Sequence, residues 1–404
     1  MTGLSELCVN RNSIEKVGKN CTGCGSCEAS CPFGAISFIR DTEGFDVPMV
    51  DTGRCTGCGI CLRHCHAYGG VSCSTGERAY MAYSLNKNRR KSSSGGAFLS
   101  FAEVAFREND AVRIYGSAFD DTGCVVHDGV ECVQDIDRFQ GSKYVQSNTI
   151  GIYARIANDL KAGYFVLFSG CPCQVAGLYS FLGERPKNLV TIDLICHGVP
   201  SPGYWEKHVA SLTKGSFRSA SFRMKSYADK NRYLLRVESD GKSIRRNPEQ
   251  DLYFNAFMKG LDYRESCYTC SYASLDRPGD ITVGDCASSA LRKDYYPWEQ
   301  MSFVMPNTEQ GREFWKVSAS SFEFCEVDIE TESKLNHQLS KAVNRPDVRD
   351  SFYTMIAKGE QASLENRFTV RFCGLGFFFK RMMKLLIPNR IRGILTKMGA
   401  SCGR

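Results

Sequence analysis

The sequence predicts an α+β domain over residues 1–80, followed by an α/β domain with a mixed sheet over residues 81–345. Two observations support this division. A cysteine pattern occurs twice near the amino end, and apolar segments of strand length alternate with helix-like segments from residue 97 onward. Residues 346–404 are set apart as a basic, amphipathic tail. With 404 residues, the chain is long enough for each domain to bury a core of its own.

The first domain contains two nearly identical cysteine runs. Residues 21–27 are CTGCGSC and residues 55–61 are CTGCGIC, and a fourth cysteine follows each run, at Cys31 and Cys65. Gaps of two residues let a tight loop turn three sulfurs toward one small object, and the glycines let the backbone wrap closely around it. This is the pattern of a bacterial two-cluster ferredoxin, in which each fourth ligand comes from the other run. One 4Fe-4S cluster is therefore assigned to Cys21, Cys24, Cys27 and Cys65, and the other to Cys55, Cys58, Cys61 and Cys31.

A disulfide framework and zinc knuckles are weaker interpretations of these cysteines. Disulfide frameworks are typical of small secreted chains, and zinc sites use pairs of CxxC rather than a triple followed by a fourth cysteine. The second run departs from the ferredoxin pattern in one place, because His66 follows Cys65 where Pro32 follows Cys31. Between the runs, residues 35–39 predict a strand, and residues 44–48 predict a turn into another.

The second domain shows a regular alternation of predicted elements. After a basic, serine-rich joint, these are a helix at 97–107, strands at 111–119 and 124–127, a helix at 149–160, a strand at 164–168, a helix at 174–182, a strand at 189–195, a helix at 203–212 and strands at Phe222, Leu234 and Ile281. Helical apolar spacing marks the first helix, and Ser201 and Pro202 mark the start of the last. The run at 164–168 is continuously apolar, as expected of a strand buried on both faces.

The positive charge of the chain is concentrated at its end. From Arg367 onward there are nine Lys or Arg and no Asp or Glu, and removing these nine from the net charge of +7 leaves the rest at −2. Nucleic-acid binding by the two domains is therefore not expected. Residues 377–387 mix aromatics, methionines and cations with helical spacing, which suits a helix at an anionic membrane surface, or one packed on its own domain or a partner.

No signal peptide and no apolar run long enough to span a bilayer is found in the sequence. We therefore expect a cytoplasmic protein, with the tail as a contact to the inner face of the membrane.

Five motifs of the second domain occur in a fixed order. They are KSSSGG at 91–96, GSKYVQS at 141–147, GCPCQVAG at 170–177, CHGVPS at 196–201, and Cys267-x2-Cys270 followed by DITVGD at 280–285. Together with the ferredoxin pattern, they resemble the coenzyme F420 hydrogenase/dehydrogenase beta-subunit family, in its bacterial type, over residues 1–340. The resemblance implies FAD in the α/β domain, connected to the iron–sulfur clusters.

The resemblance also implies the residues that bind the flavin. The serine-glycine stretch precedes a helix, where backbone N–H groups and hydroxyls can hold a phosphate, although such a stretch alone is more often a linker. The predicted cofactor-binding residues are Ser93, Ser94, Gly95, Gly96, Gly141, Ser142, Lys143, Tyr144, Gln146, Ser147, Gly170 and Gln174. Lys143 and His197 are the predicted catalytic residues, with a surface turn and a structural histidine as the alternatives.

Four further thiols are candidate ligands of a third 4Fe-4S cluster: Cys173, Cys196, Cys267 and Cys270. Two of them follow predicted buried strands, so their loops should lie at the same edge of the sheet. Scattered structural thiols and a structural zinc are the alternatives. Cys171 and Cys286 depart from the family pattern, and Cys171 competes with Cys173 as a ligand. The other cysteines, Cys8, Cys73, Cys124, Cys132, Cys325, Cys373 and Cys402, show no ligand spacing and are taken as structural.

The predicted function is that of an iron–sulfur flavoprotein oxidoreductase. By this interpretation, electrons pass between the 4Fe-4S clusters and FAD, and FAD exchanges hydride with coenzyme F420 or another organic substrate. An external carrier such as ferredoxin exchanges electrons with the clusters. The alternative is a non-catalytic subunit that relays electrons to a partner enzyme, for example in surface polysaccharide biosynthesis.

Overall fold

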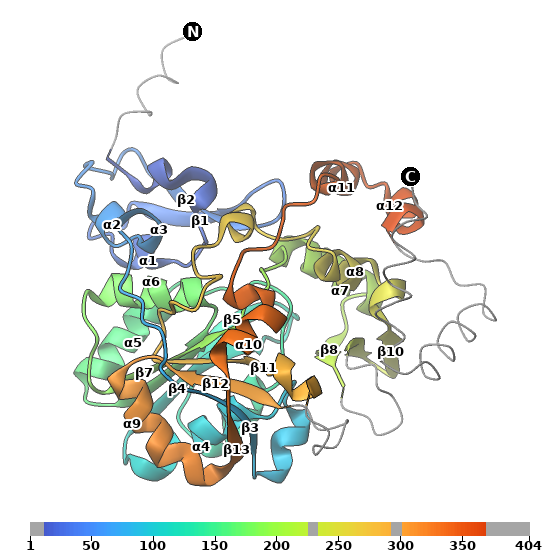
Figure 1. Cartoon of the computed structure of the whole chain (residues 1–404). Helices are drawn as coiled ribbons and strands as arrows, with labels where there is room; N and C mark the ends of the chain where they lie inside the picture. The colour runs from blue at the N-terminus through green and yellow to red at the C-terminus, as the bar shows by residue number, and fades with distance from the viewer. Residues whose placement is uncertain (1–11, 225–232, 292–300, 369–404) are drawn as a thin grey trace, which may run out of the picture.

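The computed structural model describes residues 12–224, 233–291 and 301–368 (Figure 1). The predicted amphipathic helix at 377–387 and three cysteines, Cys8, Cys373 and Cys402, lie outside the described residues.

The N-terminal lobe is built around a two-stranded antiparallel hairpin, in which β1 (Ile36–Arg40) pairs with β2 (Asp46–Val50). The predicted strand at 35–39 is therefore confirmed. Short helices surround the hairpin: η1 (Ile14–Asn20), α1 (Ser26–Ala29), α2 (Ile60–Arg63) and α3 (His66–Gly69). Apolar side chains of η1, β1, β2 and α2 pack together with the cysteines, so the lobe is organised around its thiols.

A large mixed sheet forms the second part of the molecule, with strand order β13-β3-β12-β11-β7-β6-β4-β5. Its four central strands are parallel: β4 (Val112–Phe119), β6 (Phe165–Gly170), β7 (Leu189–Leu194) and β11 (Ile281–Asp285). Antiparallel strands flank them, with β5 (Val125–Val130) on one side and β12 (Ser302–Pro306), β3 (Ala79–Ser84) and β13 (Phe322–Val327) on the other. The predicted α/β domain with a mixed sheet is confirmed.

Helices cover both faces of this sheet. On one face, α4 (Ala97–Glu108) and α9 (Glu309–Ser318) share an apolar core that includes Leu167 of β6. On the other, α5 (Ile152–Lys161) and α6 (Pro172–Leu182) pack on Val166 and Phe168. Successive side chains of a strand point to opposite faces, so the continuous apolar run predicted as a buried strand serves both cores.

A smaller sheet lies beside the large one, on the right in Figure 1, with order β10-β9-β8. Its strands are β8 (Phe217–Arg223), β9 (Tyr233–Ser239) and β10 (Lys242–Arg246). It shares an aromatic core around Trp205 and Tyr253 with α7 (Pro202–Thr213), α8 (Leu252–Met258), α11 (Arg349–Ala357) and α12 (Gln361–Phe368). Residues 349–368, which belong to the predicted tail, thus pack on this core.

The remaining helices are short. They are α10 (Ile329–Leu335) and the 3-10 helices η2 (Lys87–Lys91), η3 (Val133–Phe139), η4 (Pro248–Gln250), η5 (Glu265–Thr269), η6 (Ala287–Leu291), η7 (Ala319–Ser321) and η8 (His337–Leu339). Every helix and strand predicted for the second domain is present, with ends shifted by a few residues. Within the described ranges, no helix combines the length and apolar composition that crossing a bilayer requires.

A buried ion pair fixes the carboxyl end of β7. Arg277 and Asp193 are both inaccessible to solvent, and the guanidinium donates to Oδ1 of Asp193 from Nε at 3.0 Å and from Nη2 at 2.8 Å. Arg277 also donates to the carbonyl oxygens of Tyr272 and Leu194. This one side chain therefore ties the segment after Cys270 to the end of β7, just before Cys196.

Replacing Arg277 by Met should lower the free energy of unfolding by about 3–5 kcal/mol, because the Asp193 carboxylate would stay buried without its cation. Denaturant unfolding measures the loss. Arg218→Met is the matched control, since Arg218 pairs with Asp240 at the surface, where an ion pair contributes about 1 kcal/mol or less. Equal losses in the two variants would contradict the structural role given to Arg277.

Candidate functional site

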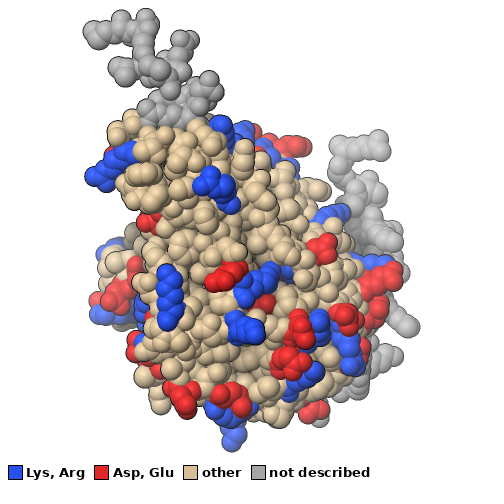
Figure 2. Space-filling view, turned by 90° about the vertical axis from the view of Figure 1, so that its left-hand side faces the viewer, with Lys and Arg blue, Asp and Glu red and all other residues tan. Residues whose placement is uncertain are grey.

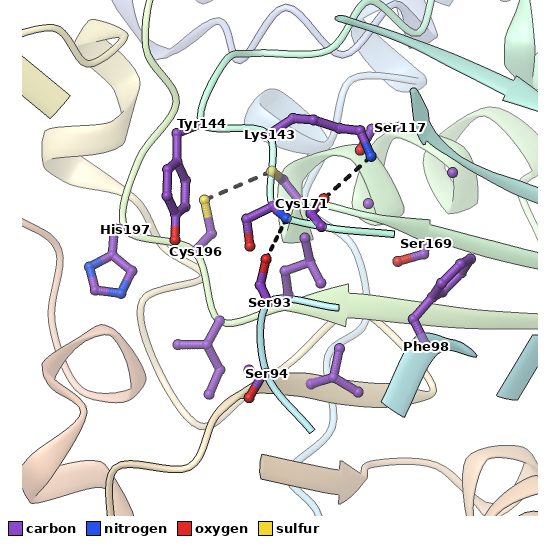
Figure 3. Close-up of a pocket in the computed structure, with 18 of the residues that line it drawn as sticks. Ser93, Ser94, Phe98, Ser117, Lys143, Tyr144, Ser169, Cys171, Cys196 and His197 are labelled. Atoms are coloured by element: carbon purple, nitrogen blue, oxygen red, sulfur yellow. Dashed lines mark hydrogen bonds between the residues drawn. The ribbon is translucent and has the colours of Figure 1, made fainter. Parts of the chain in front are cut away.

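A cavity of about 280 Å³ opens at the carboxyl edge of the large sheet. The ends of all four parallel strands contribute to its wall, through Ser117, Ser169, Leu194 and Asp285. Ligands of open α/β sheets bind at this edge, where the connections of neighbouring strands diverge. In Figure 3, Tyr144, Cys196 and His197 lie toward one end of the cavity, and Ser117, Ser169 and Phe98 toward the other.

The serine-glycine stretch lines this cavity just before α4. Gly96 has φ +84°, a left-handed conformation suited to glycine, and it begins the helix. The backbone N–H of Ser142 donates to Ser93 Oγ at 2.6 Å, and Ser94 Oγ donates to the carbonyl of Met301 at 2.7 Å. The serine side chains thus fix the turn, which leaves the start of a twelve-residue helix facing the cavity.

Gly95 is the one residue of this stretch that serves packing instead. It does not line the cavity, and a Cβ atom there would lie 2.3 Å from the carbonyl oxygen of Ala82. Gly95 therefore allows the turn to lie directly against β3 and β12.

Lys143 places positive charge in the cavity wall. Its Nζ donates to three backbone carbonyls, those of Arg138, Gln140 and Gly141, at 3.1–3.3 Å. Burial lowers the pKa of Lys143 to about 7. Since all three protons are used within the loop, Lys143 contributes charge and loop shape rather than a spare hydrogen-bond donor.

Tyr144 forms an aromatic wall. Its ring stacks on Phe257, with centroids 4.3 Å apart and an interplanar angle of 17°, and Tyr253 Oη donates to the carbonyl of Tyr144 at 2.7 Å. Burial, as the main cause, raises the pKa of Tyr144, so the phenol stays protonated.

His197 is exposed to the cavity mouth. Desolvation lowers its pKa, an effect opposed by the Asp285 carboxylate and reinforced by Arg223. Arg223 and Asp285 form an ion pair at 2.7 Å that lines the same wall. A neutral imidazole beside a fixed ion pair can accept or deliver a proton at this opening.

The end of β6 supplies Gly170 to the cavity, and the start of α6 supplies Cys171 and Gln174. Gln174 Nε2 donates to Ser147 Oγ at 2.9 Å, and its Oε1 accepts from the Cys171 backbone N–H at 2.9 Å. Gln146 does not line the cavity. It donates to the carbonyl of Thr22 at 2.9 Å and accepts from Arg264, so it joins the second domain to the first cysteine run.

The structure brings the other predicted cofactor-binding residues together around this cavity: Ser93, Ser94, Gly96, Gly141, Ser142, Lys143, Tyr144, Ser147, Gly170 and Gln174. Their role in binding stays a prediction.

The structure brings the thiols of the N-terminal lobe together in two groups, and their assignment as cluster ligands stays a prediction. Burial raises the pKa of Cys24 to about 12, and the neighbouring Cys21 and Cys65 thiols raise it further. Burial also raises the pKa of Cys27, next to the same thiols. The second set lines one small cavity, which contains Cys31, Cys55, Cys58 and Cys61. Only the second set includes a solvent-exposed thiol, that of Cys58.

A third group of thiols lies between the lobe and the large cavity. Burial raises the pKa of Cys173, and the thiols of Cys196, Cys270, Cys267 and Cys24 raise it further, in that order. The predicted third set is thus brought together, next to Cys24, a predicted ligand of the first set. Among the described residues, no three His, Cys, Asp or Glu side chains converge as ligands of a single metal ion. A 4Fe-4S cluster does not need ligands that converge on a single ion, since each thiolate binds a different iron.

Cys171 belongs to the same neighbourhood but faces the large cavity. Its Sγ lies 3.8 Å from Cys196 Sγ (Figure 3), and Cys171 is the N-cap residue of α6. Cys286 lies elsewhere, buried beside the Glu332 carboxylate.

His66 explains the departure from the ferredoxin pattern. It is buried, with Nε2 3.0 Å from Thr22 Oγ1 and Nδ1 2.8 Å from Tyr272 Oη. Burial lowers its pKa to about 4, so the ring is neutral. A proline could make neither contact, and His66 therefore links the two cysteine runs to the second domain.

The comparisons with known proteins agree with this geometry. Residues 165–330 match the family model for the C terminus of the coenzyme F420 hydrogenase/dehydrogenase beta subunit, and residues 20–68 match the 4Fe-4S dicluster domain. Over these two ranges the chain is similar to the coenzyme F420 hydrogenase/dehydrogenase beta subunit and to two-cluster iron–sulfur domains. The resemblance found in the sequence is confirmed over these ranges, which combine a 4Fe-4S dicluster domain with a segment similar to an oxidoreductase subunit.

One similar solved structure is a chain of the F420-reducing NiFe hydrogenase complex from Methanosarcina barkeri. The similarity covers 67% of this chain and 90% of the solved chain, with 18% sequence identity and a TM-score of 0.47. No curated protein matches the chain.

Arg223 and His127 are among the cavity residues that were not found from the sequence. Arg223 is the last residue of β8, and its pairing with Asp285 depends on the fold. His127 is a lone histidine of β5, and no motif surrounds it. Neither position carries a local signal that sequence analysis could have used.

Replacing Gly177 by Ala should disturb the contact between α6 and the first cysteine run. The added Cβ would lie 2.8 Å from Cys24 Sγ and 2.9 Å from Tyr153 Oη, closer than real contacts allow. We expect a stability loss of about 1–3 kcal/mol, measured by denaturant unfolding, together with a lower iron content per chain.

Ser180→Ala is the control for this variant, because it changes a side chain of the same helix and keeps the carbonyl that contacts His64 Nδ1 at 2.7 Å. A Gly177→Ala protein with unchanged stability and iron content would contradict the described docking.

Proposed function

We propose that this protein is an iron–sulfur flavoprotein oxidoreductase, with FAD in the large cavity and three 4Fe-4S clusters bound by the three thiol groups. The observation that carries the proposal is that the three thiol groups follow one another from the surface of the lobe to the large cavity. The exposed Cys58 belongs to one set, Cys24 of the next set neighbours Cys173, and Cys196 of the third lines the cavity. This order connects the surface of the lobe to the edge of the large sheet.

The cavity wall fits a flavin dinucleotide in its charge and shape. The start of α4 and its serine turn offer backbone N–H groups to a phosphate. In its protonated form Lys143 adds a positive charge, and in the described part of the chain no carboxylate lies within hydrogen-bonding distance to neutralise it. The stacked rings of Tyr144 and Phe257 offer an apolar surface to an aromatic ring system.

When bound, FAD supplies hydride exchange with an organic molecule and one-electron exchange with the clusters. The protein's own residues would then position and enclose it. Tyr144 keeps water from one wall, Gln174 holds the start of α6 to Ser147, and His197 can move a proton at the mouth. Coenzyme F420 or another organic hydride carrier would be the substrate at that mouth.

An external carrier protein such as ferredoxin would meet the outer cluster set. Charged side chains are sparse over the N-terminal lobe in the view of Figure 2, and four large apolar side chains of the lobe are exposed: Phe33, Ile39, Met49 and Tyr68. Phe33 lines the same small cavity as Cys58. An apolar rim beside an exposed thiol set suits transient docking of a redox protein. Membrane contact through the tail stays a prediction on residues outside those described.

Anaerobic purification of the full chain tests the proposal. We expect about one FAD per chain, with reduction of the bound flavin by at least one of reduced ferredoxin, NADH, NADPH and reduced coenzyme F420. We expect about eight to twelve irons per chain, depending on occupancy of the third site. Clusters without flavin would overturn the enzyme and favour the relay subunit, whereas four irons or fewer would overturn the cluster assignments.

The Cys-Pro-Cys segment offers a matched pair of variants for the third cluster. Cys173→Ser should lower the iron content by about four per chain, because a cubane ligand is lost. Cys171→Ser should leave it unchanged, since serine also serves as an N-cap for α6. The opposite result, with iron lost only from the Cys171 variant, would transfer the ligand role to Cys171.

A further inference from the structure

His127 carries a buried acceptor that the proposed function has not used. The residue lies in β5 with 4% of its surface exposed, and it lines the large cavity. Its Nδ1 atom is buried and has no hydrogen-bond partner among the described residues. Buried polar atoms are nearly always satisfied, so one without a partner in a cavity wall calls for a ligand group.

The protonation of the His127 ring follows from its surroundings. Nε2 lies 3.0 Å from the carbonyl oxygen of Ser169, which can only accept, so the ring N–H is on Nε2. Burial lowers the pKa of His127 to about 4, and the nearby Lys143 ammonium adds to the shift. The ring is therefore neutral, and Nδ1 presents a lone pair.

The ring is also held in place. It stacks on Phe168, with centroids 5.3 Å apart and an interplanar angle of 22°, and its backbone N–H donates to the carbonyl of Asn148 at 2.8 Å. Gln140, which lines the same cavity, has a second buried acceptor, Oε1, for which the described ranges offer no partner. The cavity thus offers preformed acceptors to a ligand that brings donors.

We propose that His127 is a positioning residue of the cofactor site, whose Nδ1 accepts a hydrogen bond from an N–H or O–H group of the bound flavin. This inference rests on the proposed flavin site. The flavin part of oxidised FAD carries two kinds of such donor, the imide N–H of the ring at N3 and the hydroxyls of the ribityl chain. Either one satisfies Nδ1, and neither requires proton transfer.

Two substitutions separate this role from a purely structural one. His127→Gln can keep a donor to the Ser169 carbonyl, in the place of Nε2, but removes the acceptor at the Nδ1 position. His127→Asn can keep an acceptor near Nδ1 but loses the bond to Ser169. The readout is the FAD dissociation constant, measured by flavin fluorescence on the full chain with its clusters in place.

We expect His127→Gln to weaken FAD binding about tenfold with an unchanged unfolding midpoint, and His127→Asn to stay within about threefold of wild type. FAD methylated at N3 identifies the donor. If the imide N–H is used, wild type discriminates against the methylated form and His127→Gln does not. If a hydroxyl is used, both proteins bind the two forms alike, while His127→Gln still weakens FAD.

Wild-type affinity in the His127→Gln variant would overturn this inference and leave the flavin site intact. A larger loss in His127→Asn than in His127→Gln would assign His127 the structural role of holding Ser169. A wild-type chain that binds no FAD would overturn the flavin site and this inference together.

Discussion

The docking of the first cysteine run onto α6 is the constraint on which the rest of the arrangement depends. Gly177 has no side chain, so Cys24 can reach the surface of the helix. Cys173 precedes Gly177 by four residues, and residues four apart lie on the same face of a helix. The thiols of Cys24 and Cys173 are therefore neighbours because one rigid turn of helix carries both the contact and the next thiol. A bulkier residue in the middle of α6 would separate the two thiol groups.

The large sheet brings together thiols that are far apart in the sequence. Parallel strands end at a common edge, so the loops after β6 and β7 deliver Cys173 and Cys196 to neighbouring positions. The CxxC segment comes later in the chain and has no strand to place it. Arg277 places this segment instead, because it donates hydrogen bonds to the carboxylate of Asp193 in β7 and to the carbonyl of Tyr272, just after Cys270. Burial of this ion pair makes the placement rigid.

Sequence analysis succeeded where the signal is local and failed where it is not. Cysteine spacing, apolar runs and motif order all depend on near neighbours, and they predicted the lobe, the central strands and most of the cavity. Strand β3 was missed because it is buried almost throughout and lacks alternation, and it pairs with β12 and β13, more than 200 residues away. The same holds for His127. The position of its ring depends on Ser169, Phe168 and Asn148, which lie far from it in the sequence.

The two cysteine runs show that the surroundings of a cluster site are not determined by the spacing of its ligands. Their sequences are almost identical, yet Cys24 is buried against α6 while Cys58 is exposed. Burial raises the pKa of Cys24, whereas a backbone N–H near Ile60 lowers that of Cys58. Solvent exposure and hydrogen bonds to sulfur are among the factors that set cluster potentials. A difference in potential between the two proposed clusters would therefore arise from the docking of one run and not the other, because the ligand spacing cannot supply it.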